Sequence, residues 1–140
     1  MKKVTAKQLM IGDWVKWKGK YKRVDYLPKP VFDPISKIAL EMDDNEYLSY
    51  IRSATPIPIT EEWLKLNGWS ELNYVETLYH KSDSKIISMF YRLKNGVITI
   101  NNVENEDMIK YLLKIENIQY IHQLQQVYRL ACNKELKVKF

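Results

Sequence analysis

The stretch from Tyr120 to Cys132 places the strongest constraint on the fold, because its apolar residues recur at helical spacing. These residues are Ile121, Leu124, Val127, Tyr128 and Ala131. The spacing predicts a core helix over Tyr120–Cys132 that ends near Asn133. The opposite face of this helix carries a polar stripe without an acidic residue, made of His122, Gln125, Gln126 and Arg129. The sequence leaves open whether the stripe faces water, contacts a neighbouring strand or binds a partner.

Length and composition limit the classes to which the chain can belong. A chain of 140 residues suits one ordinary domain or two small lobes that share a core. Ten tyrosines and four tryptophans against four glycines favour a strand-rich fold. The only cysteine, Cys132, cannot form an intramolecular disulfide and fits a reducing compartment. No apolar run is long enough for a signal peptide or a membrane span, so we expect a cytoplasmic protein without membrane contact.

A β-hairpin is predicted within residues 13–27, closed around a Lys-Gly-Lys sequence. A three-residue connection places Trp17 opposite Tyr21, whereas a two-residue connection places Trp17 opposite Lys20. The first register buries more apolar surface, so the sequence favours it.

Further short strands are predicted over Ser36–Met42 and Glu46–Ile51, after a proline-rich loop at residues 27–34. With the hairpin, this makes about four strands in residues 1–54. That number suits a small SH3-like β-barrel whose fifth strand comes from elsewhere in the chain.

A short helix from about Glu61 to Asn67 has the best local signals, with Thr60 as its N-cap and Asn67-Gly68 as a left-handed stop. An antiparallel meander follows, with an Asn95-Gly96 turn and predicted strands at residues 73–80, 85–93 and 96–101.

Residues 108–115 fit a helical face but also alternate as a strand does, and we predict a strand over Ile109–Ile115. A last short strand is predicted over Glu135–Phe140. The predicted fold is therefore α+β, with a small SH3-like β-barrel lobe at 1–54 and an antiparallel β-meander with two helices at 55–140. We expect the two lobes to form one compact unit with a shared core.

Several motifs occur in a distinctive order: Gly12-Asp13-Trp14-Val15, Pro56-Ile57-Pro58-Ile59-Thr60, Gly68 and His122-Gln123-Leu124-Gln125. With these anchors the chain resembles a family of small uncharacterised Bacteroidetes proteins, often encoded near prophages or other mobile elements. The resemblance covers most of the chain and implies architecture and genomic setting, but no activity or ligand.

Residues that could carry catalysis do not converge in the sequence. His80 and His122 lack His, Cys or paired carboxylates at metal-ligand spacing. Cys132 lies nearly three helical turns from His122, too far for a nucleophile–base pair. The isolated glycines form no phosphate-binding loop. We therefore expect a non-enzymatic protein without metal or cofactor.

Two surfaces remain as candidates for binding. Residues 1–30 hold nine Lys or Arg and two Asp, a local net charge of +7, which could attract an anionic partner. We expect an accessory or adaptor protein that acts through protein binding and is compatible with homo-oligomers. The alternative is a nucleic-acid-binding protein that uses the basic aromatic hairpin Trp14–Arg23. The candidate surface residues are Lys16, Lys18, Lys20, Lys22, Arg23, His122, Gln125, Gln126 and Arg129.

Overall fold

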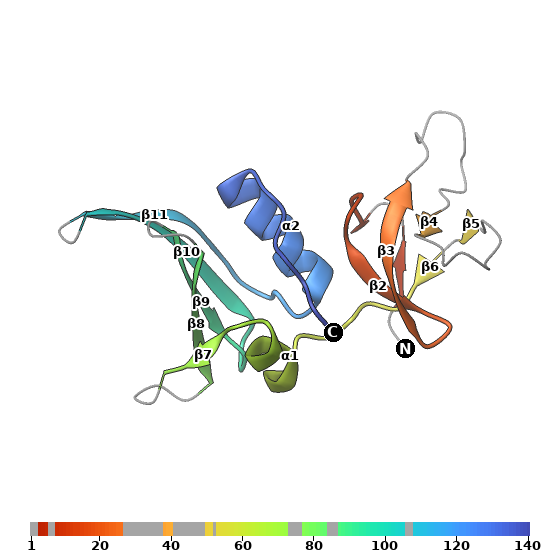
Figure 1. The fold of residues 1–140 in the computed structure, drawn as a ribbon, viewed down its shortest axis with the longest axis horizontal. Helices are drawn as coiled ribbons and strands as arrows, with labels where there is room; N and C mark the ends of the chain where they lie inside the picture. Colours follow the sequence, from red (N-terminus) through yellow and green to blue (C-terminus); the bar gives the residue numbers. More distant parts are fainter. Residues whose placement is uncertain are drawn as a thin grey trace. The chain divides into compact units, whose positions relative to one another are not determined.

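The protein has an α+β fold of mostly antiparallel sheets with two helices (Figure 1). The computed structural model describes residues 3–5, 8–26, 38–40, 50–51, 53–72, 77–83, 87–105 and 108–140. The chain forms two compact units. Unit 1 comprises Met1–Pro58 and Tyr120–Gln126, and unit 2 comprises Ile59–Gln119 and Val127–Phe140. The division thus falls after Pro58, and a segment far along the chain joins the amino-terminal unit.

Unit 1 contains one four-stranded antiparallel sheet and one short strand pair. The sheet has the order β2-β3-β4-β5, and β1 pairs with β6. Among the described residues, these strands do not close into a barrel. The strands are β1 (Val4–Thr5), β2 (Trp14–Trp17), β3 (Lys20–Tyr26), β4 (Ile38–Leu40), β5 (Tyr50–Ile51) and β6 (Ser53–Ala54). The predicted strands at 36–42 and 46–51 are seen only in part as β4 and β5, and the predicted proline-rich loop lies outside the described residues.

The β2–β3 hairpin corrects the register that the sequence favoured. Trp17 pairs with Lys20, so the connection has two residues. Both Lys18 and Gly19 have positive φ, 48° and 74°, as a two-residue turn that matches the strand twist requires. The same register places Val15 on the buried inner face of the sheet. Backbone twist at the turn therefore outweighed the aromatic pairing on which the prediction rested.

Among the described residues, unit 1 contains a buried cluster of aliphatic side chains. A half-buried Trp17 packs against a buried cluster of Val4, Leu9, Val15, Val24 and Ala54.

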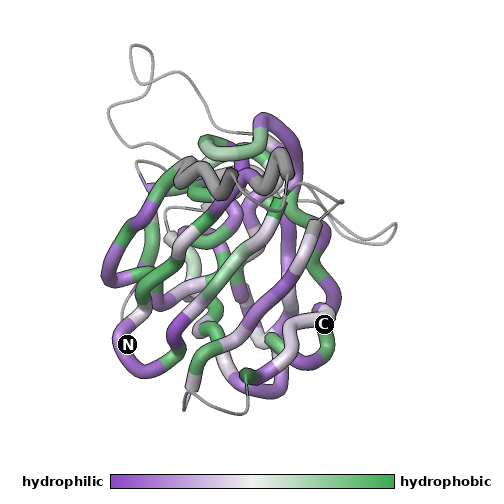
Figure 2. The backbone as a smooth tube through the Cα atoms, turned by 90° about the vertical axis from the view of Figure 1, so that its left-hand side faces the viewer, coloured by the Kyte–Doolittle hydropathy of each residue, from purple (hydrophilic) through white to green (hydrophobic). Residues whose placement is uncertain are grey.

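Unit 2 is built on a five-stranded antiparallel sheet of order β11-β10-β9-β8-β7. Side chains along β9 alternate between buried and half-buried, with Ile87, Met89 and Tyr91 inside. Figure 2 shows hydrophobic and hydrophilic residues following one another along several strands. The strand predicted over Ile109–Ile115 is confirmed as β11. The strands are β7 (Ser70–Glu71), β8 (Leu78–Asp83), β9 (Ile87–Arg92), β10 (Val97–Asn105) and β11 (Met108–Ile115).

Helix α1 (Glu61–Leu66) confirms the predicted helix and its N-cap Thr60. The Thr60 hydroxyl accepts a hydrogen bond from the backbone N–H of Trp63 at 3.2 Å, which satisfies one of the unpaired amides of the first turn. Gly68 follows the helix with φ of 83°. The capping residues act on neighbours that are close in sequence, so the sequence alone predicts this helix.

Helix α2 (Ile121–Cys132) is the helix predicted from the apolar spacing. Its residues up to Gln126 belong to unit 1 and those from Val127 onward to unit 2. Asn133, with φ of 54°, ends it. Neither helix in the described part of the chain is long and apolar enough to cross a membrane.

The strand predicted over Glu135–Phe140 is wrong, because the residues after α2 have no regular secondary structure. The backbone of Lys139 instead bonds to the side chain of Asn67. The Asn67 oxygen accepts from the Lys139 N–H at 2.7 Å, and the Asn67 amide donates to the Lys139 carbonyl at 3.0 Å. One side-chain amide thus supplies both hydrogen bonds that a neighbouring strand would offer.

Replacing Gly96 by Ala should destabilise the protein by about 2–5 kcal/mol, since a left-handed backbone and a steric clash add together. Gly96 has φ of 68°, and a Cβ there would lie 2.7 Å from the Ile118 carbonyl oxygen. Gly68→Ala is the matched control in the same unit, because its Cβ would meet nothing closer than 3.9 Å. Its cost should be only about 1–2 kcal/mol. Urea unfolding of both variants measures the difference, and equal losses would contradict the clash.

Candidate functional site

A tight turn at Met10–Asp13 leads into β2 and is held by hydrogen bonds between its own residues. The Asp13 N–H donates to the Met10 carbonyl at 3.1 Å, and the Met10 N–H donates to the Asp13 carboxylate at 2.8 Å. Gly12, with φ of 93°, donates its N–H to the Val24 carbonyl at 2.8 Å. The Asp13 side chain is fully buried. The turn is therefore closed on itself and tied to β3.

Helix α2 supplies a second set of hydrogen bonds to the same turn, all within unit 1. The Gln125 amide donates to the Gly12 carbonyl at 3.0 Å, and its oxygen accepts from the Trp14 N–H at 2.9 Å. The Gln126 amide donates to the Asp13 carboxylate at 2.7 Å and to the Gln8 carbonyl at 2.8 Å. These bonds fix the backbone on both sides of residues 10 and 11.

Two apolar side chains lie exposed on this fixed backbone. Met10 is 47% exposed and Ile11 is 58% exposed. Exposed turn positions are usually occupied by Gly, Pro, Asn, Asp or Ser, so an adjacent Met and Ile are unusual there. We call residues Met10 and Ile11, with their exposed side chains, the apolar tip.

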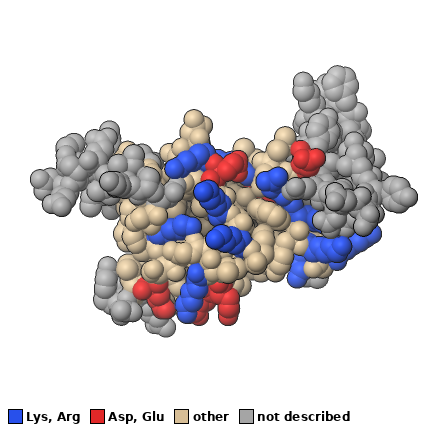
Figure 3. All heavy atoms as spheres, viewed as in Figure 1, with Lys and Arg blue, Asp and Glu red and all other residues tan. Residues whose placement is uncertain are grey.

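The outer face of the β2–β3 hairpin is the second feature of interest. Residues paired across antiparallel strands share a face, so Trp14 with Arg23 and Lys16 with Tyr21 lie on the same side. The Tyr21 side chain is 46% exposed, and the Lys16 ammonium lies 5.7 Å from the centre of its ring. Figure 3 shows a group of Lys and Arg side chains over this hairpin.

Four of the predicted basic residues, Lys16, Lys18, Lys20 and Arg23, are exposed on or beside this face. The Lys18 ammonium lies 4.6 Å from the centre of the Trp17 ring. Lys22 is different: it pairs with Val15 on the inner face and is buried. Strand alternation therefore removes it from the candidate surface.

The polar stripe of α2 does not form an open surface. His122 and Gln125 are buried, at 3% and 1% exposure, and the His122 ring stacks on the Tyr120 ring at 5.9 Å. Gln126 bonds to the turn, and the Arg129 guanidinium bonds to the Glu135 carboxylate at 2.7 Å. The stripe therefore contacts neighbouring segments of the chain, which is one of the possibilities that the sequence left open.

Sequence reasoning missed the apolar tip. The signal available was an apolar Met-Ile pair directly before Gly12-Asp13, a turn-forming sequence. Exposure of the pair depends on where α2 packs, which no local pattern shows.

Among the residues that the structure describes, no three His, Cys, Asp or Glu side chains gather closely enough to hold a metal ion. No family model matches the sequence, and neither a curated protein nor a solved structure is similar to it. The resemblance to the small Bacteroidetes proteins therefore stays a prediction.

Gln125→Met should lower the free energy of unfolding by about 2–3 kcal/mol, because it leaves the Trp14 N–H and the Gly12 carbonyl without their partner at nearly unchanged volume. Gln126→Met is the matched comparison on the same helix. Gln126 is half-buried, so water can replace part of what it loses, and its cost should be about 1 kcal/mol. Denaturant unfolding of the two variants tests this, and a smaller loss for Gln125→Met than for Gln126→Met would refute it.

Proposed function

We propose that this protein is a non-enzymatic accessory or adaptor protein whose apolar tip binds a protein partner. The observation that carries the proposal is the exposure of Met10 and Ile11 on a turn whose backbone is held by Asp13, Gln125 and Gln126. Burial of apolar surface contributes roughly 25 cal/mol per Å² of favourable free energy. Burial of both side chains in an apolar pocket of a partner would therefore favour binding.

The hydrogen bonds around the apolar tip should raise its affinity for a partner as well as stabilise the turn. Ordering a loop on binding costs free energy, and a loop that is already fixed avoids most of that cost. Met adapts its three rotatable bonds to irregular surfaces, whereas the β-branched Ile is stiff. The pair thus combines one adaptable and one rigid anchor on a fixed turn.

The proposal also includes an SH3-like architecture for unit 1 and a cytoplasmic location. An SH3-like arrangement of unit 1 is supported by two backbone bonds that join β2 to the residue after β6: Lys16 N–H to the Thr55 carbonyl at 2.8 Å, and Thr55 N–H to the Lys16 carbonyl at 2.9 Å. A cytoplasmic location is supported by the single free Cys132.

Membership in the resembled family is supported by contacts among its anchor segments within unit 1. Gln125 bonds to Gly12 and Trp14, and the Ile57 carbonyl accepts from the Ile121 N–H at 2.9 Å. Motifs that specify one packing arrangement are expected to meet in this way.

The double variant Met10→Ser/Ile11→Ser should weaken partner binding while it leaves stability unchanged, since the backbone bonds of the turn do not involve either side chain. Affinity capture from extract of the source organism, quantified by mass spectrometry, should show a specific protein reduced roughly tenfold or more, as expected for loss of a central apolar anchor. Leu130→Ser is the matched control, because Leu130 is also apolar and 77% exposed but lies in unit 2. A protein profile that is the same for all three chains would refute the proposal.

A second candidate function is binding of single-stranded nucleic acid by the outer face of the hairpin. Tyr21 is exposed between the cationic Lys16 and Arg23, and an aromatic ring among cations can stack a base and neutralise phosphates. Because Lys22 is buried, this face carries one positive charge fewer than the sequence predicted. Nucleic-acid binding by the hairpin is therefore less well supported than protein binding by the apolar tip.

Tyr21→Ala should weaken binding of a fluorescent oligothymidine or oligouridine by roughly tenfold, the loss expected for one stacked base. Lys16→Gln/Arg23→Gln should reduce the salt dependence of binding, because fewer phosphate contacts release fewer counterions. The control Lys94→Gln/Lys114→Gln removes two exposed charges from unit 2 and should change neither property. Absence of salt-dependent binding by the unmodified protein at low ionic strength would exclude this function.

A further inference from the structure

Unit 2 contains a small pocket between β8, the second half of α2 and the segment that follows α2. Its volume is about 210 Å³, and it is lined by Lys81, Tyr128, Lys134, Glu135, Leu136 and Lys137. Pockets for drug-sized ligands usually measure about 300–1,000 Å³. This pocket therefore suits one small chemical group rather than a large molecule.

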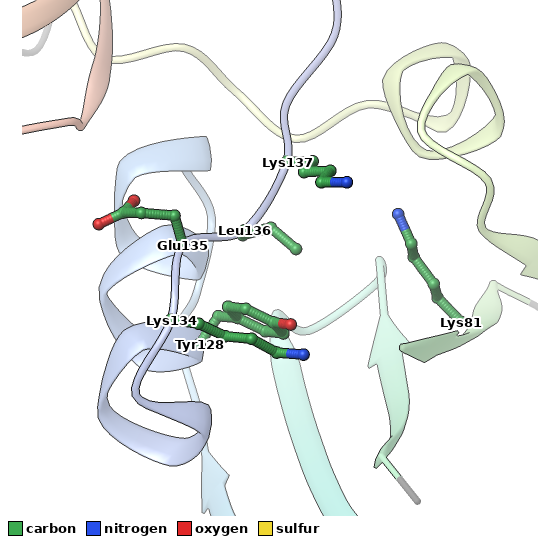
Figure 4. A pocket seen from close by; sticks show the side chains of 6 residues that line it. All are labelled: Lys81, Tyr128, Lys134, Glu135, Leu136 and Lys137. Carbon is green, nitrogen blue, oxygen red and sulfur yellow. The ribbon is translucent and has the colours of Figure 1, made fainter. Parts of the chain in front are cut away.

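The ionisable side chains at the pocket are mostly cationic. Figure 4 shows the side chains of Lys81, Lys134 and Lys137 extending to the side where Leu136 and the Tyr128 hydroxyl lie. The Glu135 side chain extends to the opposite side, where its carboxylate bonds to Arg129 at 2.7 Å. Three ammonium groups and one phenol hydroxyl thus border the hollow, and all four are hydrogen-bond donors.

The fold holds this arrangement in place from two directions. After α2, the Asn133 N–H donates to the Arg129 carbonyl at 2.8 Å, and the left-handed Asn133 turns the chain back. The returning segment is held at its far end by the bonds between Asn67 and Lys139. The Lys81 ammonium donates to the Asn67 carbonyl at 2.5 Å, so the same residue positions the wall supplied by β8.

Two of the lysines that line the pocket are also exposed at the surface of unit 2. Lys134 and Lys137 are exposed, and Figure 3 shows several Lys and Arg side chains, with fewer acidic ones among them, on the face that carries α2 and the carboxy-terminal segment. Such a field attracts small anions from solution. Leu136, which is buried, gives the pocket an apolar wall.

We propose that this pocket binds the phosphate group of a small phosphate monoester. A monoester is close to a dianion at neutral pH and has three strong acceptor oxygens, which matches several ammonium donors better than a singly charged carboxylate does. Lysine is a common phosphate ligand that acts as a point charge. The apolar wall at Leu136 accommodates the organic part of the ester. The pocket lies in unit 2 and shares no residue with the apolar tip, so this inference is independent of the proposed protein-binding function.

Phenyl phosphate is the probe that tests the proposal, with benzoate as a matched monoanion that carries the same ring. Binding to the full chain is followed by two-dimensional NMR at low ionic strength and about pH 8, above the second phosphate pKa of about 6. Phenyl phosphate and inorganic phosphate should shift the amide signals of residues 134–137, and benzoate should bind at least several-fold more weakly.

Lys134→Gln/Lys137→Gln should weaken phenyl phosphate binding roughly tenfold, because two charges leave the pocket. Both side chains are exposed, so the fold should be retained, and the NMR spectrum verifies this. Lys94→Gln/Lys114→Gln removes the same charge from exposed residues of unit 2 that do not line the pocket and should leave affinity within about twofold, because solvent and salt screen exposed charges.

Several results would overturn the proposal. They are equal affinity for benzoate, an unchanged affinity in the pocket variant, an equal loss in the control variant, and shifts that map away from residues 134–137. Binding to vesicles that contain phosphatidic acid without any binding of phenyl phosphate would likewise exclude a small soluble ester as the ligand.

Discussion

The side-chain amide of Gln125 is the interaction on which the candidate surfaces of unit 1 depend. It satisfies the Gly12 carbonyl and the Trp14 N–H, which lie 113 and 111 residues earlier in the chain. A buried backbone group without a partner costs about 1–3 kcal/mol, so this amide stabilises the start of β2 and the turn before it, in addition to the bonds that the turn makes itself. The apolar tip and the β2–β3 hairpin are therefore both attached to α2 through Gln125.

Asn67 has a comparable role in unit 2. Its side chain pairs with the backbone of Lys139, and its carbonyl accepts from Lys81. In the neighbouring sheet, buried Tyr91 donates its hydroxyl to the Ile118 carbonyl at 2.6 Å, and burial raises the pKa of this phenol to about 12, so it remains a donor at a pH where an exposed tyrosine would ionise. Side chains thus supply hydrogen bonds to backbone groups outside the strand ladders, and Asn67 holds both Lys81 and the segment that follows α2.

The polar stripe of α2 shows why the candidate site was only partly predictable. Amphipathic spacing identifies which residues oppose the apolar face, but it does not identify what lies against them. The sequence placed Gln125 on that polar face, but Gln125 is buried, and a turn distant in sequence offers its side chain one donor and one acceptor. Lys22 shows the same limit in a strand: its charge suggested a surface residue, but the hairpin register directs it inward.

The sequence by itself determined the features that local physics controls: the α+β class, the capped helix α1, the span of α2 and the strand at Ile109–Ile115. Helix caps and apolar periodicity act over a few residues, so they can be read directly from the chain. Only the tertiary structure decided the hairpin register, the irregular path of Glu135–Phe140, the burial of Gln125 and the gathering of Lys81 with Lys134 and Lys137. Each of these depends on hydrogen-bond partners or packing neighbours that are distant in sequence, and no local pattern encodes them.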